Sequence, residues 1–156
     1  MRIAVAADHA GFILKEPVIS VLRELGHDVS DLGTTDPSSP DDYPDRASDL
    51  GAAITIGAAE RGVLICGSGV GACVAANKIP GVRAAICHDT YSAHQGVEHD
   101  DMNVLCIGAR VAGTELVAEI VRAFAGASFS NAPRHVRRLE KVLAIERRYQ
   151  GSGGSA

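Results

Sequence analysis

The sequence has few aromatic residues, no excess of positive charge and no long apolar run. Aromatic side chains make up 4% of its 156 residues and tryptophan is absent, which argues against the base-stacking surfaces of single-strand nucleic-acid binding proteins. Its 19 acidic and 15 basic side chains leave a net charge of -4, the wrong sign for general binding to nucleic acid or anionic membranes. No apolar run approaches the roughly 20 residues of a membrane-spanning helix. We therefore expect neither nucleic acid nor membrane as a partner.

The cysteines also lack the pattern of a disulfide framework. Four of them, Cys66, Cys73, Cys87 and Cys106, occur in or beside apolar segments and do not show the regular spacing of small secreted domains. The apolar stretch at residues 2–7 is too short for the core of a signal peptide. We therefore expect free thiols and a cytoplasmic protein.

Length and composition indicate one ordered domain. Apolar residues account for 46% and charged residues for 22% of the sequence, which is close to ordinary globular usage and excludes a disordered chain. We expect residues 1–150 to form a single domain. Residues 151–156, Gly-Ser-Gly-Gly-Ser-Ala, have the composition of a flexible linker left by cloning and are left out of the fold.

The spacing of the apolar residues predicts an α/β fold. Short apolar strand patterns occur at residues 2–7, 63–66, 82–87 and 103–107, and an alternating pattern typical of a more exposed strand occurs at residues 27–32. Helical spacing occurs at residues 12–25, 45–61 (with Asp45 as N-cap), 72–78, 90–97, 113–124 and 131–149. Alternating strands and helices of this kind form right-handed βαβ units. We therefore expect a three-layer α/β/α Rossmann-like fold around a five-stranded parallel sheet.

Reactive side chains follow four of the predicted strands directly. Ligands of such sheets bind beyond the carboxyl ends of the strands. The segments at these ends are Asp8-His9-Ala10-Gly11, Cys66-Gly67-Ser68-Gly69-Val70-Gly71, His88-Asp89 and Gly108-Ala109-Arg110. The sequence thus predicts one functional edge carrying cysteine, histidine, aspartate, serine and arginine.

Three glycines at alternate positions, Gly67, Gly69 and Gly71, form a loop between a strand and a helix. Such a loop leaves backbone N–H groups pointing at a bound anion. Its spacing matches neither the dinucleotide-binding fingerprint nor a Walker A loop, which needs Gly-Lys-Ser/Thr. A tight turn without a ligand is the alternative, but a single glycine would suffice for that. The pattern favours an anion site.

Cys66 stands at the mouth of this loop. A thiol near a helix N-terminus has its thiolate form favoured, so Cys66 could act as a nucleophile or as a proton-transfer base. A buried structural cysteine is the alternative, and it is what we expect of the other three.

Histidines and arginines in the second half are further candidates. His94 and His99 could suggest a metal site, but they are five residues apart and do not share a helix face as metal-binding histidine pairs do. Ordinary loop histidines or an acid–base histidine are therefore favoured. Arg134 and Arg138 share one face of the last helix and could bind an oxyanion together, with a solvated helix face as the alternative.

Several of these motifs resemble a known family in register. They are Asp8-His9-Ala10-Gly11, Asp42-Tyr43-Pro44, Cys66-Gly67-Ser68-Gly69-Val70-Gly71 with Ala75-Ala76-Asn77-Lys78, Glu98-His99, Asn103-Val104-Leu105, Gly108-Ala109-Arg110 and Arg134-His135 through Arg138. Over residues 2–149 the chain resembles the type-B ribose-5-phosphate isomerases, a family that includes galactose-6-phosphate isomerase subunits.

The resemblance implies a metal-free, cofactor-free aldose–ketose isomerase that works through a cis-enediolate. Cys66 would move the proton between carbons 1 and 2, and His99 would assist opening of the furanose ring. The enediolate oxygen would be stabilised by Ser68 and by the amides of Gly67, Gly69, Val70 and Gly71.

The resemblance also implies how the substrate is bound. Asp8 and Tyr43 would hold sugar hydroxyls, and the phosphate would be bound by His9, Arg110, Arg134 and Arg138. The sites would form across the interface of a homodimer, or of a tetramer built from such dimers, with the last helix extending to a partner subunit.

Asp100 departs from the pattern of the family, which often has asparagine directly after the histidine. A carboxylate can only accept hydrogen bonds, whereas the amide also donates them, so Asp100 bears on which substrate hydroxyl is recognised. Ribose 5-phosphate is the expected substrate, and a tetrulose, allose or galactose phosphate is the alternative. A non-catalytic sugar-phosphate binding module and a thiol hydrolase using Cys66 and His99 are the competing functions.

Overall fold

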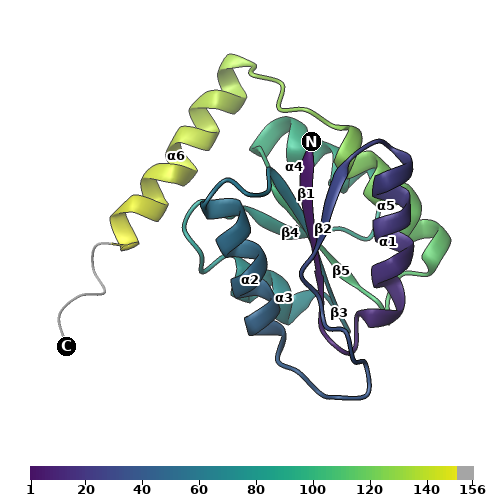
Figure 1. The fold of residues 1–156 in the computed structure, drawn as a ribbon. Helices are drawn as coiled ribbons and strands as arrows, with labels where there is room; N and C mark the ends of the chain where they lie inside the picture. The colour runs from purple at the N-terminus through teal and green to yellow at the C-terminus, as the bar shows by residue number, and fades with distance from the viewer. Residues whose placement is uncertain (151–156) are drawn as a thin grey trace, which may run out of the picture.

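A computed structural model describes residues 1–150, and the tail expected at 151–156 lies outside the described residues. The expected alternation of strands and helices is confirmed (Figure 1). The elements are β1 (Arg2–Ala7), α1 (Phe12–Glu24), β2 (Asp28–Asp31), α2 (Tyr43–Thr55), β3 (Arg61–Cys66), α3 (Val70–Ala76), β4 (Ala84–Ile86), α4 (Thr90–Asp100), β5 (Val104–Gly108), α5 (Thr114–Gly126) and α6 (Pro133–Gln150).

The five strands form one parallel sheet in the order β2-β1-β3-β5-β4. Helices α1, α4 and α5 supply apolar side chains to one face of this sheet, and α2 and α3 supply them to the other. The three-layer α/β/α prediction is therefore confirmed. The strand order reverses between β1 and β3, and a doubly wound sheet opens a binding crevice beyond the carboxyl ends at such a point.

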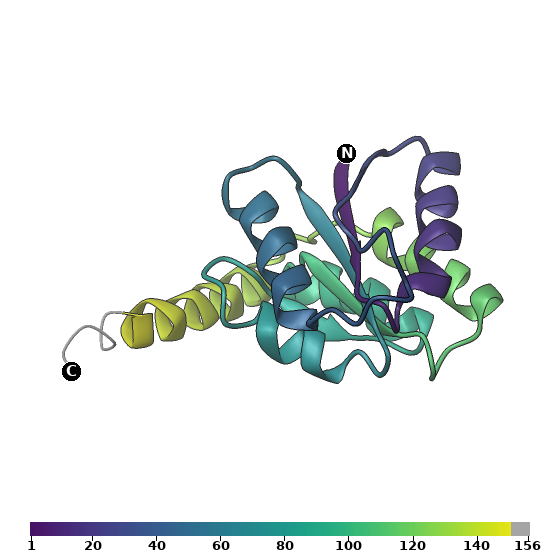
Figure 2. The same cartoon turned by 60° about the horizontal axis from the view of Figure 1, so that its bottom comes forward.

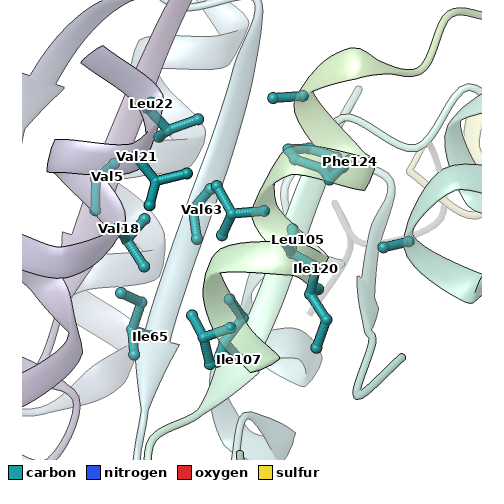
Figure 3. Packing of buried hydrophobic residues seen from close by; sticks show 14 of the residues in the cluster. Val5, Val18, Val21, Leu22, Val63, Ile65, Leu105, Ile107, Ile120 and Phe124 are labelled. Carbon is teal, nitrogen blue, oxygen red and sulfur yellow. The ribbon is translucent and has the colours of Figure 1, made fainter. Parts of the chain in front are cut away.

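The central strands carry apolar residues on both faces because both faces are covered. On the first face, helices α1 and α5 pack against strand residues Val63, Ile65, Leu105 and Ile107 (Figure 3). Phe124 is one of the α5 residues in this layer. On the second face, alternate strand residues pack against α2 and α3. Full burial of a leucine or isoleucine contributes about 1.5–3 kcal/mol, so these layers fix the strand register and with it the positions of the strand ends.

Two helix boundaries differ from the prediction and bear on the site. Helix α2 begins at Tyr43 and ends at Thr55, well before residue 61. Its N-cap residue is Asp42, whereas Asp45 lies in the first turn, where a carboxylate interacts favourably with the helix dipole. The helix ends early because Gly57 adopts a left-handed φ of +73° and its N–H donates to the carbonyl of Ile54.

Helix α4 is longer than predicted, since it continues past residue 97 to Asp100. It ends where Asp101 adopts a left-handed φ of +51°. His99 and Asp100 consequently lie in the last turn of a helix and not in a loop.

Helix α6 leaves the body of the domain and projects to one side (Figures 1 and 2). Within the domain it packs against α4. The apolar side chains of Val142 and Ile145 on α6 are 51% and 58% exposed. Among residues 1–150, no helix is both long enough and apolar enough to cross a membrane.

Candidate active site

A pocket of about 330 Å³ opens at the carboxyl edge of the sheet, at the reversal of strand order between β1 and β3. It is built from the loops after β1, β3 and β5 and from the start of α2. The residues that line it are Asp8, His9, Ala10, Tyr43, Cys66, Gly67, Ser68, Gly71, Arg110 and Val111. The side chains predicted from the strand ends after β1, β3 and β5 thus meet in one cavity. His88 and Asp89, which follow β4, do not line it.

Cys66 is the last residue of β3 and is only 5% exposed. The backbone N–H of Gly69 donates to its Sγ atom at 3.1 Å. Gly69 has a left-handed φ of +83°, a conformation that is costly for residues with a Cβ. The loop after β3 therefore holds the sulfur of Cys66 in place at the wall of the pocket.

The loop after Cys66 presents fewer amides to the pocket than its sequence suggests. Gly69 directs its N–H to sulfur, and the N–H of Val70 donates to Ser68 Oγ at 3.3 Å. Gly69 and Val70 are not among the residues that line the pocket. The N–H groups of Gly67 and Ser68 have no hydrogen-bond partner within residues 1–150 and remain available to a ligand.

Tyr43 lies across the start of α3 because position 71 is glycine. A Cβ atom on Gly71 would stand 2.6 Å from Tyr43 Cζ, which is closer than real contacts allow. The phenol is 41% exposed and forms one wall of the pocket. The third glycine of the loop therefore makes room for an aromatic side chain, a use that the spacing of the glycines could not indicate.

His9 is oriented by a residue that the sequence reading did not identify, Asp41. The backbone N–H of His9 donates to Asp41 Oδ1 at 2.7 Å, and the Nδ1 atom of the ring lies 3.1 Å from the same oxygen. Arg46 Nε faces the other carboxylate oxygen at 3.6 Å. This arrangement leaves His9 Nε2 available to a ligand. Asp41 lies in the long connection between β2 and α2, and nothing else in the sequence distinguishes it.

Asp8 and Arg110 complete the pocket from β1 and β5. Asp8 is 5% exposed, and one of its oxygens, Oδ1, accepts a hydrogen bond from the N–H of Gly11 at 2.8 Å. Arg110 is exposed and its guanidinium lies beside Gly67, with no ion-pair partner in the part of the chain that the structure describes. The pocket thus contains one buried carboxylate, that of Asp8, and one guanidinium, that of Arg110, which forms no ion pair within residues 1–150.

Four predicted residues, His99, Asp100, Arg134 and Arg138, lie away from this pocket in the same chain. Helix α4 ends just before Val104, which pairs with Gly62 near the start of β3, whereas Cys66 pairs with Gly108 at the other end of β5. The length of β5 separates these two edges by roughly 13 Å. The structure therefore groups the predicted residues in two places, one at each edge of the sheet.

The second group is organised around a buried histidine, His135. Its ring packs on that of His99 with centroids 4.0 Å apart, and Arg134 Nε donates to its Nε2 atom at 3.0 Å. His94 Nδ1 and His99 Nε2 both face Glu98, at 3.6 and 3.8 Å. Within residues 1–150, no three histidine, cysteine, aspartate or glutamate side chains are arranged to hold a metal ion.

The remaining cysteines differ more than expected. Burial raises the pKa of the Cys87 thiol to about 11 and contributes to a raised pKa at Cys106. Cys73 is only partly buried, and hydrogen bonding from Cys106 is the main cause that lowers its pKa to about 7. The expectation of three buried structural cysteines agrees with the burial of Cys87 and Cys106, whereas Cys73 is only partly buried.

The chain is similar to characterised isomerases along nearly its whole length. The family described as Ribose/Galactose Isomerase matches residues 3–142. Ribose-5-phosphate isomerase B of Escherichia coli (strain K12) is 46% identical over 147 residues, which cover 94% of this chain and 97% of that protein. D-erythrulose-4-phosphate isomerase of Pectobacterium atrosepticum is 42% identical over 145 residues, covering 91% and 93%.

Solved structures of relatives have the same fold. The structure of type B ribose 5-phosphate isomerase from Trypanosoma cruzi superposes with a TM-score of 0.92 at 42% identity, covering 95% of this chain and 99% of that one. Similarity of this extent includes every element that builds the pocket. The chain belongs to the ribose/galactose isomerase family and is an enzyme of the sugar-phosphate isomerase class.

Proposed function

We propose that the protein interconverts ribose 5-phosphate and ribulose 5-phosphate through a cis-enediolate, with Cys66 as the base. The observation that carries this proposal is the bond from Gly69 N–H to Cys66 Sγ, beside the unpaired amides of Gly67 and Ser68. A base and hydrogen-bond donors for a developing oxyanion are the two elements that an aldose–ketose isomerisation needs.

The reaction would proceed by one proton relay on the open-chain sugar. Cys66 thiolate removes the proton from carbon 2 of the aldose, and the electron pair moves into the carbon 1–carbon 2 bond to give the enediolate. The oxygen of carbon 1 takes up the carbonyl electron pair and becomes the negative oxygen of the enediolate. The same thiol then returns the proton to carbon 1, and the hydroxyl proton on the oxygen of carbon 2 passes to the oxygen of carbon 1, so that the ketone forms at carbon 2. The amides of Gly67 and Ser68 stabilise the negative oxygen, and Asp8 and Tyr43 hold the hydroxyls.

The phosphate would be bound by His9 and Arg110 together with Arg134 and Arg138. The latter two lie with His99 at the opposite edge of the sheet, so a second copy of the chain would have to supply them. The projecting α6 supports a homodimer, because its exposed Val142 and Ile145 border an open, mostly apolar groove of about 460 Å³ between α6 and the β4–α4 edge. Burial of such a face stabilises subunit association.

Replacement of the base tests the mechanism. Cys66→Ala should abolish exchange of the carbon-2 proton with solvent, followed by NMR in deuterated water, while the sugar phosphate still binds. Cys73 lies on α3, is only partly buried and does not line the pocket. Cys73→Ala is therefore the control and should retain activity. Turnover by Cys66→Ala would contradict the assignment. A covalent adduct of Cys66 with substrate would favour a thiol hydrolase instead.

A tetrulose 4-phosphate is the second candidate substrate. The observation that favours it is Asp100, a pure acceptor where the family often has asparagine, together with a 42% identical relative named D-erythrulose-4-phosphate isomerase. An assay of tetrose, pentose and hexose phosphates with the wild type and Asp100→Asn decides between them. A wild type that prefers the tetrulose 4-phosphate, with an Asp100→Asn variant that prefers ribose 5-phosphate, would support the second candidate. Binding of all without turnover would indicate a non-catalytic module.

A further inference from the structure

His135 is a buried histidine whose side chain contacts two of the four predicted residues in the second group, His99 and Arg134. It is 2% exposed and lies in the first turn of α6. Its Nδ1 atom is 2.6 Å from Ser130 Oγ, its Nε2 atom accepts from Arg134 Nε at 3.0 Å, and its ring packs on His99 at 4.0 Å with a tilt of 35°. Both ring nitrogens are therefore engaged inside the protein.

The partner of Nε2 fixes the charge and tautomer of this ring. A guanidinium N–H can only donate, so Nε2 of His135 must carry a lone pair and no proton. The single ring proton is then on Nδ1, where it donates to Ser130 Oγ. Ser130 is itself held in place, since its backbone N–H donates to the carbonyl of Glu98 at 3.0 Å.

The surroundings of His135 agree with a neutral ring. Burial is the main cause that lowers its pKa, and the positive charges of His99, Arg134 and Arg138 act in the same direction. The carboxylate of Glu98 opposes them more weakly. These groups come from α4 and α6, the two elements that enclose the ring.

The bond to His135 also determines what Arg134 can do. The hydrogen bond from Nε to the histidine restrains the guanidinium plane, and it leaves the edge formed by the two terminal nitrogens with N–H donors that His135 does not use. Two parallel N–H donors of this kind suit a phosphate. A flexible arginine would lose more conformational freedom when it binds the same anion.

We propose that His135 is a positioning residue. It is a neutral histidine protonated on Nδ1, and it fixes the position of the Arg134 guanidinium relative to the ring of His99. One buried side chain would thus align the phosphate clamp with the group that opens the sugar ring. The proposal rests on the proposed function for the roles of Arg134 and His99.

Two substitutions separate the two contacts of His135. His135→Phe keeps an aromatic ring against His99 but removes the acceptor for Arg134. His135→Gln can place a carbonyl oxygen near the position of Nε2 but removes the ring. A hydrogen bond to a charged group contributes about 1.5–3 kcal/mol, so we expect His135→Phe to raise the KM for sugar phosphate and the Kd for inorganic phosphate by at least about tenfold. His135→Gln should lower kcat while its KM stays within about threefold of wild type.

Nitrogen NMR of the full-length protein labelled with 15N-histidine tests the tautomer without reference to activity. The His135 signal, assigned by its loss in His135→Phe, should show a protonated Nδ1 and an unprotonated Nε2 at neutral pH. A protonated Nε2, a charged ring, or equal changes of kcat and KM in both variants would overturn the proposal. A wild type that binds phosphate but does not isomerise sugar phosphates would overturn the proposed function alone. The tautomer of His135 and the effect of its substitution on the Kd for phosphate can still be measured in that case.

Discussion

At the scale of single residues, the pocket depends on neighbours that hold its functional groups in place. Gly69 N–H holds Cys66 sulfur, and Asp41 holds the backbone and ring of His9. Neither partner would be chosen from the sequence for its own reactivity. The reactive residues could be predicted because they directly follow strands. Their hydrogen-bond partners depend on loop conformations, which cannot be predicted from the spacing of apolar residues.

Removal of the carboxylate behind His9 should weaken substrate binding. Asp41→Ala removes the carboxylate from the His9 ring, which keeps only its contacts with the backbone of residue 41. It also leaves the backbone N–H of His9 without a partner, which costs about 1–3 kcal/mol, so we expect KM to rise by about tenfold with a smaller change in kcat. Asp42→Ala is the matched control, since the neighbouring Asp42 is exposed and its side chain makes no capping hydrogen bond. Steady-state kinetics measure both. Equal effects of the two substitutions would contradict a specific role for Asp41.

Cys73 should react with electrophiles at lower pH than the buried thiols. Its pKa of about 7 means that the thiolate forms as the pH rises through 7, whereas Cys87, with a pKa of about 11, stays protonated there. Alkylation by iodoacetamide, followed by peptide mass spectrometry from pH 5 to 9, should rise at Cys73 with a midpoint near 7. Cys73→Ser removes that signal. Alkylation of Cys87 at the same pH as Cys73 would contradict this assignment.

At the scale of elements, the carboxyl ends of the strands position the pocket and the ends of the helices position the second group. A helix that follows a parallel strand runs back toward the amino edge of the sheet. Residues at the end of α4 must therefore lie far from the strand ends, as His99 and Asp100 do. This consequence was available from the sequence once the βαβ order was known, although the extension of α4 to Asp100 was not.

The contact between the end of β5 and the loop after β3 tolerates no side chain. A Cβ atom on Gly108 would stand 2.5 Å from the carbonyl oxygen of Ser68, and backbone cannot move aside cheaply. Overpacking of this kind costs about 1–3 kcal/mol, so Gly108→Ala should lower the melting temperature by several degrees and reduce kcat by displacing the Cys66 loop.

Gly113→Ala provides the control for that substitution. Its Cβ would meet nothing within 4 Å, and its φ of -75° suits alanine. We expect wild-type kinetics and, by calorimetry, a melting temperature that falls less than in Gly108→Ala, because Gly113 is the N-cap residue of α5 and alanine is a weaker N-cap than glycine. A Gly108→Ala variant that behaves like Gly113→Ala would show that the loop adapts and that this contact does not fix Cys66.

At the scale of the whole molecule, one chain holds both groups of the proposed site but keeps them at opposite edges of the sheet. The apolar pattern of the sequence predicted α6, yet the pattern does not say which surface covers that helix. Val142, Ile145 and the groove beside them are open in the single chain. We therefore expect association through α6 to be required for activity.

A charge introduced on α6 should break this association. Ile145→Asp places a carboxylate where we expect apolar contact, and an unpaired buried charge costs several kcal/mol, so analytical ultracentrifugation should show monomers with little isomerase activity. Lys141→Asp, at an exposed position of the same helix outside the groove, should remain associated and active. A dimeric Ile145→Asp would place the interface elsewhere.

Complementation between two inactive variants tests most directly whether the site combines the two groups from different chains. Cys66→Ala and His99→Ala should each lack activity when assayed alone. When the two are unfolded and refolded together, half of the dimers should be mixed, and each mixed dimer should contain one intact site, giving about one quarter of the wild-type rate. We expect that recovered rate. A mixture as inactive as its two components would show that the two groups of a site do not come from different chains.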